Sequence, residues 1–394
     1  MRRPIRQLTF MAATSLALAA CDTSTAPTAL DEARLAPALQ FSAVKFWEAG
    51  ATVAWNAQAV DLARATAVDA GRMHLYLALA QLRAAEAAQA TVPDPPVGAA
   101  IGAASAVVLV AFFPASAGQI EAALDAQAAA ISWPGARHED FGAGEEIGRA
   151  AAARVLAYAA GDRVGLTDPG TPPVGEGNWK WSGGPMARGN LGARPIFLAS
   201  ADEFRPVAPP PFGSARFTAA LNEVRQIADT RTAEQLAIAN YWNVNQSPRS
   251  QAAYMEIARE LIVSHRLKDA EAARLMFLMG AASFDALIGC FDAKYHYWYI
   301  RPQQADAGIV TAFPTPPHPS YPSAHSCSSG AIAGVLAATF PSEARRLAAV
   351  AEESGLSRLY AGIHFRFDME AGLALGQAVA AKALMADLDE VAVR

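Results

Sequence analysis

The sequence has little of the positive charge that a polyanion-binding protein needs. Its 394 residues include 32 Lys and Arg against 37 Asp and Glu, which gives a net charge of −5 and a pI near 5.8. No run rich in Lys and Arg occurs after the first seven residues. Proteins that bind nucleic acids usually carry a basic patch or stripe. We therefore expect no nucleic-acid partner.

The sequence also lacks the strict alternation of apolar and polar residues that marks half-buried β-strands. Apolar residues recur at helical spacing instead, and hydrophobic residues make up 53% of the chain, which is ample for a sizeable core. No internal repeat is present, and no low-complexity tract apart from a richness in alanine. We predict an all-α fold, a helical bundle with its functional site between facing helices.

Cysteine is rare, and the first of the three, Cys21, ends a recognisable N-terminal pattern. It follows a basic head and a short apolar stretch over residues 8–20, which is typical of a secretory signal and too short for a membrane span. The sequence Leu-Ala-Ala-Cys resembles a bacterial lipobox, in which the cysteine is acylated; a plain signal peptide is the alternative. We predict a lipoprotein signal peptide at residues 1–20, a tether at 21–40 and a single all-α domain at 41–394.

The predicted export has two consequences. A lipid on Cys21 would make the protein an exported bacterial lipoprotein, anchored to a membrane on the periplasmic, extracytoplasmic side. In such an oxidising compartment Cys290 and Cys327 could form a disulfide, and two free buried thiols fit the sequence equally well.

Two segments allow alternative interpretations: one contains no charged residue, and the other has no helical pattern. Val97 to Phe113 contains no charged residue, which is at the lower limit for a membrane-spanning helix, but its Gly and Ala content favours a buried core helix. Residues 164–215 are rich in Gly and Pro and contain Trp179 and Trp181. We expect an ordered wrap over the helical core there, with a disordered insert as the alternative.

Three short polar clusters lie at residues 294–302, 321–326 and 357–368, within otherwise apolar, helix-forming sequence. In the first, Lys294 and Arg301 are seven residues apart, so both can project from one helical face. Proline disfavours helical geometry in the residue before it, so Arg301 is expected at the end of that helix.

The second cluster follows a proline-rich loop and places Ser323, Ala324 and His325 ahead of an alanine-rich helical pattern. Such a helix start presents free N–H groups that bind anions. In the third cluster Asp368 follows His364 by four residues, so its carboxylate can accept the ring N–H of the histidine and raise its basicity. Together with the cations of the clusters, these groups suit the binding of a tetrahedral oxyanion and chemistry on it.

The three clusters resemble, motif by motif, the superfamily of type 2 phosphatidic acid phosphatases (PAP2), bacterial class A acid phosphatases and vanadium-dependent haloperoxidases. The family pattern is Lys-x6-Arg-Pro, then Pro-Ser-Gly-His, then Ser-Arg-x5-His-x3-Asp. The first and third motifs are complete here, and the second has Ala324 in place of glycine. The Trp- and Pro-rich middle segment looks like that of the secreted, haloperoxidase-related branch.

The resemblance implies a role for each motif residue. The residues that it implies as vanadate or phosphate ligands are Lys294, Arg301, Ser323, Ala324 and Arg358. His364 would be the nucleophile in a phosphatase or the axial vanadium ligand in a haloperoxidase, with His325 as general acid or base and Asp368 orienting His364. Alanine keeps the backbone N–H, so the anion cradle survives the replacement of glycine if φ at Ala324 is negative.

A further histidine, His318, lies seven residues before His325, as a second histidine does in algal bromoperoxidases, where it is linked to halide handling. The sequence His-Pro-x-x-Pro-Ser also fits a simple loop leading into a helix. His296 and the aromatic residues around it are interpreted as packing residues of a helix.

The favoured interpretation is a vanadate-dependent, haloperoxidase-like oxidoreductase that oxidises a halide with hydrogen peroxide. The alternative is an acid phosphatase that hydrolyses phosphomonoesters through a phosphohistidine intermediate. A third interpretation, a lipoprotein that binds phosphate without turnover, is disfavoured by the intact His325, His364 and Asp368. The expected partners are small molecules, either peroxide and halide or a phosphomonoester, together with a membrane at the lipid anchor. A homodimer is compatible with the sequence.

Overall fold

The computed structural model describes residues 50–66, 69–92, 95–130, 138–243 and 248–391. The predicted signal peptide, the tether and Cys21 lie outside these residues, so they stay predictions. Phe41–Arg394 makes up one of the two compact units of the chain. All the predicted site residues between Lys294 and Asp368 belong to that unit and are described.

The described residues form α-helices joined by short 3-10 turns and irregular connections, which confirms the predicted all-α fold. The α-helices are α2 (Gly50–Arg64), α3 (Ala70–Ala90), α4 (Val97–Phe112), α5 (Ala117–Ala130), α6 (His138–Ala159), α7 (Ala215–Thr230), α8 (Ala233–Tyr241), α9 (Pro248–Ser264), α10 (Asp269–Tyr297), α11 (Pro302–Ala305), α12 (Ala324–Thr339), α13 (Ala344–Tyr360) and α14 (Arg366–Met385). Short 3-10 helices lie at Pro114–Ser116, Pro341–Glu343 and Leu388–Glu390. An isolated β-bridge joins Asn178 and Tyr299.

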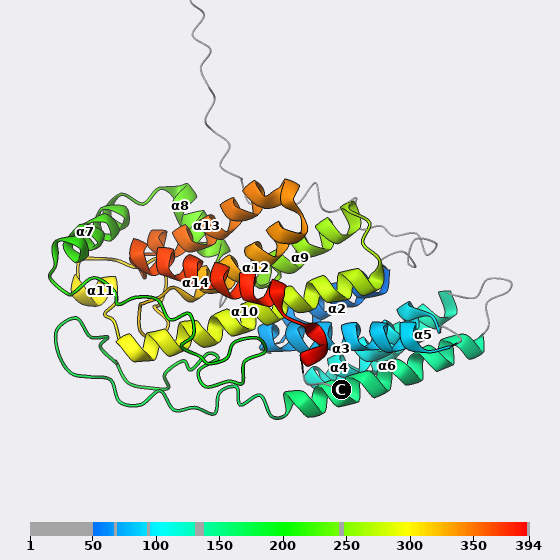
Figure 1. Cartoon of the computed structure of the whole chain (residues 1–394). Helices are drawn as coiled ribbons and strands as arrows, with labels where there is room; N and C mark the ends of the chain where they lie inside the picture. The colour runs from blue at the N-terminus through cyan, green and yellow to red at the C-terminus, as the bar shows by residue number, and fades with distance from the viewer. Residues whose placement is uncertain (1–49, 67–68, 93–94, 131–137, 244–247, 392–394) are drawn as a thin grey trace, which may run out of the picture. The chain divides into compact units, whose positions relative to one another are not determined.

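Helix α10 is the element on which the other helices of this unit are assembled. It contacts α3 as well as α12 and α14, and Figure 1 shows it running between the blue helices and the orange and red ones. By length and composition α10 is the one described helix that could cross a membrane, yet 78% of its apolar window is buried inside the protein. Its apolar character is therefore that of a central core helix.

The uncharged segment that begins at Val97 forms α4, and its side chains from Gly98 to Ala106 are buried. The segment is therefore a core helix, as predicted, and it packs against α3 and α6. Gly148 of α6 allows the close approach, because a Cβ atom at this position would lie 2.1 Å from the carbonyl oxygen of Ala100.

The connection between α6 and α7, residues 160–214, contains no helix and follows the C-terminal half of α10 in Figure 1. The buried carboxylate of Asp285 on α10 holds its middle by accepting hydrogen bonds from three successive backbone N–H groups. These belong to Ile196 at 2.9 Å, Phe197 at 2.7 Å and Leu198 at 3.1 Å. The segment is thus an ordered wrap over the helical core, as the sequence predicted.

Tyrosine hydroxyls tie the same segment to the region around Lys294. Each donates a hydrogen bond to a backbone carbonyl: Tyr295 to Ala187, Tyr297 to Pro206, Tyr299 to Pro210 and Tyr321 to Val207. His296 beside them is exposed and packs its ring on Tyr297. The aromatic residues after Lys294 are therefore packing and anchoring residues, as predicted.

We expect Asp285→Ala to lower the free energy of unfolding by about 2–4 kcal/mol, because three backbone N–H groups would lose their acceptor at once. Asp292→Ala is the matched control on the same helix: it removes only a partly exposed ion pair with Arg205 and should cost about 0–1 kcal/mol. Urea unfolding followed by circular dichroism measures both. Equal effects of the two substitutions would contradict the anchoring role of Asp285.

Candidate active site

Three cations lie inside the protein at the centre of the predicted site. Lys294 and Arg301 are 0% exposed and Arg358 is 3% exposed. The Nζ atom of Lys294 donates to the carbonyls of Pro319 at 2.9 Å and Ser320 at 2.8 Å. A buried charge is costly unless a counter-charge or a set of hydrogen bonds compensates it, so this cluster favours the binding of an anion.

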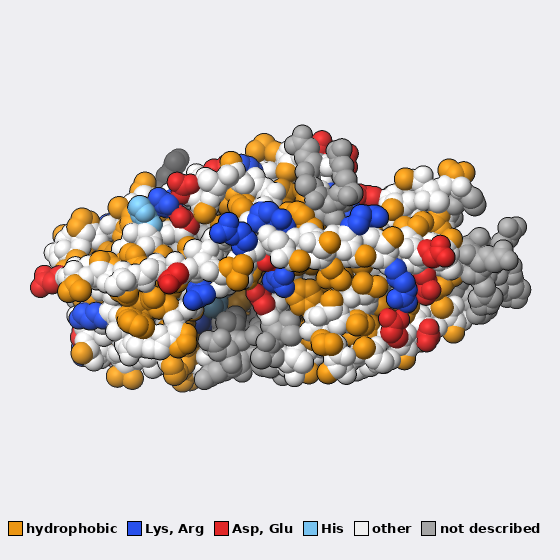
Figure 2. Space-filling view, turned by 90° about the horizontal axis from the view of Figure 1, so that it is seen from below, with side chains coloured by type: hydrophobic (Ala, Val, Ile, Leu, Met, Phe, Trp, Pro, Cys, Tyr) orange, Lys and Arg blue, Asp and Glu red, His pale blue; other side chains and the backbone are white. Residues whose placement is uncertain are grey.

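These cations differ from the basic residues of the surface. On the face in Figure 2, Lys and Arg side chains are dispersed among acidic and apolar ones. Several surface arginines form ion pairs, as Arg346 does with Glu260 at 2.8 Å. Among the described residues, no ion pair involves Lys294, Arg301 or Arg358.

The Arg301 guanidinium joins the first cluster to the third and to the proline-rich loop before the second. Its Nε donates to the carbonyl of His318 at 3.1 Å, and its Nη1 donates to that of Ile363 at 2.7 Å. The same Nη1 lies 3.1 Å from Nε2 of His364, and Nη2 lies 2.9 Å from Nδ1 of His318. Arg301 thus faces the imidazole that the resemblance identifies as the reactive one.

The predicted placement of Lys294 and Arg301 on one helical face is wrong. Helix α10 ends at Tyr297, and Trp298 takes a left-handed conformation with φ 49° that turns the chain. Arg301 follows in an extended conformation as the residue before α11. The two cations converge because the chain reverses between them.

His364 and Asp368 are paired as predicted, with 2.8 Å between Nδ1 and Oδ2. Helix α14 begins between them at Arg366, so the carboxylate in its first turn reaches back to the imidazole. The same Oδ2 accepts hydrogen bonds from the N–H of Phe365 at 3.1 Å and from the hydroxyl of Ser320 at 2.5 Å. Three donors therefore converge on one carboxylate oxygen.

Sequence reasoning missed Ser320. It is fully buried, it supports Asp368, and its backbone carbonyl accepts a hydrogen bond from Lys294. The signal in the sequence was weak, because Ser320 lies in the proline-rich lead-in and outside the second motif.

The charges in this pair decide which imidazole nitrogen can react. Burial raises the pKa of Asp368 to about 6, and the hydrogen bond from Ser320 opposes that rise. Burial, followed by the charges of Arg301 and Lys294, lowers the pKa of His364 well below its usual value. At neutral pH Asp368 is ionised and accepts the Nδ1–H of a neutral His364. The lone pair is consequently on Nε2, the nitrogen next to Arg301.

Ser323 and Ala324 form the start of α12, as predicted. The Ser323 side chain makes no capping bond to its own helix, and its buried hydroxyl has no hydrogen-bond partner. Ala324 is the first helical residue, and it is not among the residues with positive φ, so alanine replaces glycine there without strain. The unpaired hydroxyl and the free N–H groups of the helix start fit the oxygens of an oxyanion.

His325 on α12 places its Nε2 atom 2.8 Å from the carbonyl oxygen of Trp242. A carbonyl only accepts, so Nε2 carries the proton and Nδ1 has the lone pair. Burial and the nearby charge of Arg358 lower the pKa of His325 to about 3, so the ring is neutral at neutral pH. His325 in turn contributes to the lowered pKa of His364, which puts both rings in one electrostatic environment.

His318 belongs to the same buried cluster and not merely to a loop. Its Nδ1 lies between Nη2 of Arg301 at 2.9 Å and the carbonyl of Pro319 at 3.0 Å. A guanidinium only donates, so Nδ1 accepts from Arg301, and the Pro319 carbonyl takes its hydrogen bond from Lys294. This assignment leaves a proton on Nε2 of His318.

Arg358 on α13 is held from two sides. Its Nε donates to the hydroxyl of Ser357 at 2.9 Å, and its Nη2 donates to the carbonyl of Ala239 on α8 at 2.8 Å. Its guanidinium carbon lies 5.1 Å from the ring centre of Phe313, a cation–π distance. Residues outside the motifs, Ala239 on α8 and Phe313 in the loop before α12, therefore help to position this cation.

Cys290 and Cys327 are both buried and both free. The sequence left open a disulfide or two free thiols, and the structure has two free thiols. Cys290 is in contact with the second cluster, because its Sγ donates a weak hydrogen bond to the carbonyl of Pro322 at 3.8 Å.

The charge of Lys294 sets a pH limit for anion binding. Burial lowers the pKa of Lys294 to about 8, with a smaller contribution from Arg301. Burial also lowers the pKa of Arg301 to about 10 and that of Arg358 to about 9. All three side chains are protonated at neutral pH, and Lys294 is the first to lose its charge as the pH rises.

We expect the affinity for sulfate to fall as the pH rises through about 8, because binding needs charged Lys294 and sulfate stays a dianion throughout this range. Lys294→Arg should move the fall to higher pH, since an arginine keeps its charge there. Lys382→Arg, a surface control at a lysine paired with Glu203, should leave the curve unchanged. Titration calorimetry measures the affinity. A flat pH profile would show that Lys294 does not bind the anion.

Comparison with known families and structures agrees with this geometry. Residues 272–388 match the model of the PAP2 superfamily, and this range contains every predicted site residue from Lys294 to Asp368. No match was found among curated proteins.

Three solved structures with a similar fold are bacterial proteins. The first bacterial vanadium-dependent iodoperoxidase is 24% identical with a TM-score of 0.67, over 86% of this chain and 95% of that one. A bacterial vanadium-dependent chloroperoxidase in its holo form is 15% identical with a TM-score of 0.59, over 82% and 90% of the two chains. Its apo form is 15% identical with a TM-score of 0.58, over 79% and 91%. Residues 272–388 thus match the PAP2 superfamily model, and the chain has the helical fold of these haloperoxidase structures.

Proposed function

We propose that this protein is a vanadate-dependent, haloperoxidase-like enzyme that oxidises a halide with hydrogen peroxide. The observation that carries the proposal is the lone pair on Nε2 of His364, oriented by Asp368 and facing buried cations that have no acidic partner in the described structure. The fold shared with the vanadium-dependent iodoperoxidase and chloroperoxidase structures supports it.

The residues present fit vanadate as an oxyanion. Nε2 of His364 would coordinate the vanadium, and the unpaired Ser323 hydroxyl would donate to an oxygen together with the N–H of Ala324. The cations that would neutralise the remaining oxygens are Lys294, Arg301 and Arg358. When bound, vanadate supplies a Lewis acid that activates the peroxide toward a halide. No cluster of three His, Cys, Asp or Glu suited to a metal cation occurs among the described residues, so the oxyanion is the species that fits.

The other side chains handle protons and position groups. Asp368 keeps the proton on Nδ1 of His364, which leaves the lone pair on Nε2. This lone pair accepts a hydrogen bond from Nη1 of Arg301, and an oxyanion at the site would replace that contact. Nδ1 of His325 can accept a proton from the incoming peroxide, and the nearby Arg358 favours its prompt return because it disfavours an imidazolium there. We propose that the Nε2–H of His318 faces the halide, since Arg301 holds the opposite side of that ring.

A second candidate, an acid phosphatase, is favoured by the same unprotonated Nε2 and by the match to the PAP2 model. In this reaction Nε2 of His364 attacks the phosphorus of a phosphomonoester, a P–N bond forms, and the ester P–O bond breaks to release the alcohol. Nδ1 of His325 then takes a proton from the water that cleaves the P–N bond. The cations that hold vanadate would hold the phosphoryl oxygens equally well.

We also propose that the enzyme is exported and lipid-anchored through Cys21 on the periplasmic side of a membrane. The support is the basic head, the apolar stretch and the Leu-Ala-Ala-Cys sequence of the N-terminus. In this arrangement residues 21–40 would be the tether and residues 41–394 the catalytic domain.

Purified protein should brominate an organic acceptor in the presence of peroxide and bromide, and only after vanadate has been added. The measurement is absorbance of the brominated product, with p-nitrophenyl phosphate hydrolysis assayed in parallel. Hydrolysis that vanadate inhibits, without bromination, would replace the haloperoxidase proposal with the phosphatase. Absence of both activities would leave an anion-binding protein without turnover.

Two histidine variants separate the roles at the site. We expect His364→Ala to abolish vanadate retention, and His325→Ala to keep vanadate but lower kcat by about 10²–10⁴, since a general base contributes this much. His296→Ala, at an exposed histidine beyond the site, is the matched control and should behave like the unaltered protein. Equilibrium dialysis with vanadate and steady-state kinetics give the two readouts. Full activity in either site variant would refute that residue's role.

A further inference from the structure

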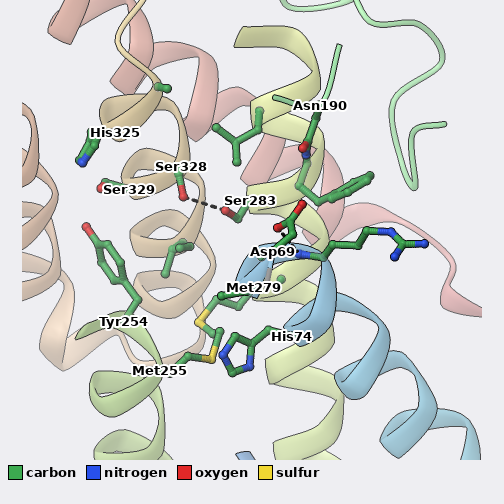
Figure 3. A pocket seen from close by; sticks show the side chains of 18 of the residues that line it. Asp69, His74, Asn190, Tyr254, Met255, Met279, Ser283, His325, Ser328 and Ser329 are labelled. Carbon is green, nitrogen blue, oxygen red and sulfur yellow. Dashed lines mark hydrogen bonds between the residues drawn. The ribbon is translucent and has the colours of Figure 1, made fainter. Parts of the chain in front are cut away.

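A cavity of about 330 Å³ lies beside the oxyanion site, which is large enough for a small organic ligand. Helices α3, α9, α10 and α12 supply most of its wall (Figure 3). The cavity shares Ala324 and His325 with the oxyanion site, whereas His364 and the three cations do not line it. His325 is therefore the residue at which the cavity and the site meet.

The opposite end of the cavity reaches the surface. Asp69 and Gly71 at the start of α3 both line it and are exposed. The charged groups at this mouth are already satisfied: Asp69 caps α3 by accepting from the N–H of Arg72 at 3.1 Å, and Arg72 pairs with Asp162 at 2.5 Å. The carboxylate of Asp69 stays exposed to solvent at this end, so the entrance favours a neutral molecule over an anion.

The wall between the two ends is mostly apolar. Met255, Met279, Leu287 and Ile332 line it, and Figure 3 shows the sulfur atoms of both methionines beside His74. Methionine side chains adapt their shape to a ligand and make favourable contacts with aromatic rings. This wall suits a neutral, apolar ring.

Two polar groups in the wall make no hydrogen bond, Nδ1 of His74 and the hydroxyl of Tyr254. The Tyr254 hydroxyl interacts with Ser329, so His74 has the greater need of a partner. Nδ1 of His74 is buried and makes no hydrogen bond, although the residue is 5% exposed. The serine hydroxyls of the wall are satisfied, since Ser283 bonds Ser328 at 2.7 Å and Ser329 donates to Ser354 at 2.9 Å. Burial lowers the pKa of His74 to about 4, so the imidazole is neutral at neutral pH. A buried, unpaired nitrogen in a cavity wall is costly unless a ligand supplies the missing hydrogen bond.

We propose that this cavity binds a small, neutral, mainly apolar organic molecule that carries one hydroxyl group, of the class of simple phenols, with the hydroxyl at Nδ1 of His74. A hydroxyl both donates and accepts, so it can satisfy this nitrogen in either tautomer of the ring. The apolar ring then lies against the methionines and points along the cavity toward His325.

This ligand would be the halogen acceptor, an assignment that rests on the proposed haloperoxidase activity. Peroxide, halide and a proton give hypohalous acid and water at the oxyanion site. The hypohalous acid then replaces one ring C–H of the phenol by a carbon–halogen bond, and the released hydrogen leaves in a second water molecule. His74 is in this view a specificity residue for the acceptor.

Binding of 4-methylphenol and of toluene to the vanadate-free full chain tests the proposal, because the two molecules differ only in the hydroxyl. We expect calorimetry to give about three- to tenfold tighter binding of 4-methylphenol, which is the usual effect of one hydrogen bond. His74→Phe should remove this preference and keep toluene binding. His265→Phe, at an exposed histidine that packs on Phe340, is the matched control and should keep the preference.

A substitution that fills the cavity provides a second test. Ile332→Trp should abolish binding of both molecules, with circular dichroism to verify the fold. Saturating sulfate should not displace 4-methylphenol, because the cations that bind the anion do not line the cavity. The proposal is overturned if neither molecule binds, if sulfate competes, or if His74→Phe keeps the preference for the hydroxyl.

The same experiment separates this proposal from the proposed function. Binding with the expected His74 dependence but without any bromination would refute the haloperoxidase and keep the ligand site. Bromination in a protein that does not bind 4-methylphenol would refute the ligand site and keep the enzyme. If both hold, the KM for 4-methylphenol should rise about three- to tenfold in His74→Phe while kcat is unchanged.

Discussion

The structure depends on burying three positive charges around one imidazole. Lys294, Arg301 and Arg358 are held by backbone carbonyls and by serine and histidine side chains, because the described ion pairs give them no carboxylate. The one carboxylate of the cluster, Asp368, is occupied by His364 and Ser320. The cluster therefore has an excess of positive charge that an oxyanion can neutralise, and its ligands are oriented before the anion arrives.

The arrangement needs a rigid frame, which the long wrap between α6 and α7 helps to provide. Asp285 fixes the middle of the wrap, and tyrosines around the site anchor its C-terminal part through their hydroxyls. The turn at Trp298 is held in the same way, since its carbonyl accepts a hydrogen bond from the N–H of Trp179 at 2.6 Å. This turn brings Arg301 back over the site, so the wrap contributes to the geometry of the cations.

Two environments of opposite character meet at His325. On one side lies the cluster of cations, and on the other lies the mainly apolar cavity, whose wall contains the unpaired Nδ1 of His74. A neutral imidazole is suited to this boundary, because burial and the charge of Arg358 both oppose its protonation. The same boundary would keep a polar oxidant and an apolar acceptor close together in separate subsites.

The sequence by itself determined the features that depend on local geometry. Helical periodicity specified the all-α fold, and the uncharged, Gly- and Ala-rich composition of residues 97–113 specified the buried helix α4. The spacing of four residues brought Asp368 within reach of His364. The spacing of Lys294 and Arg301 did not predict the position of Arg301, because the left-handed conformation of Trp298 ends the helix between them. No sequence pattern indicated the roles of Ser320 and His74, because the residues around them come from segments far apart in the chain. Only tertiary packing decides which side chains share one buried volume, because that requires contacts between residues far apart in the chain.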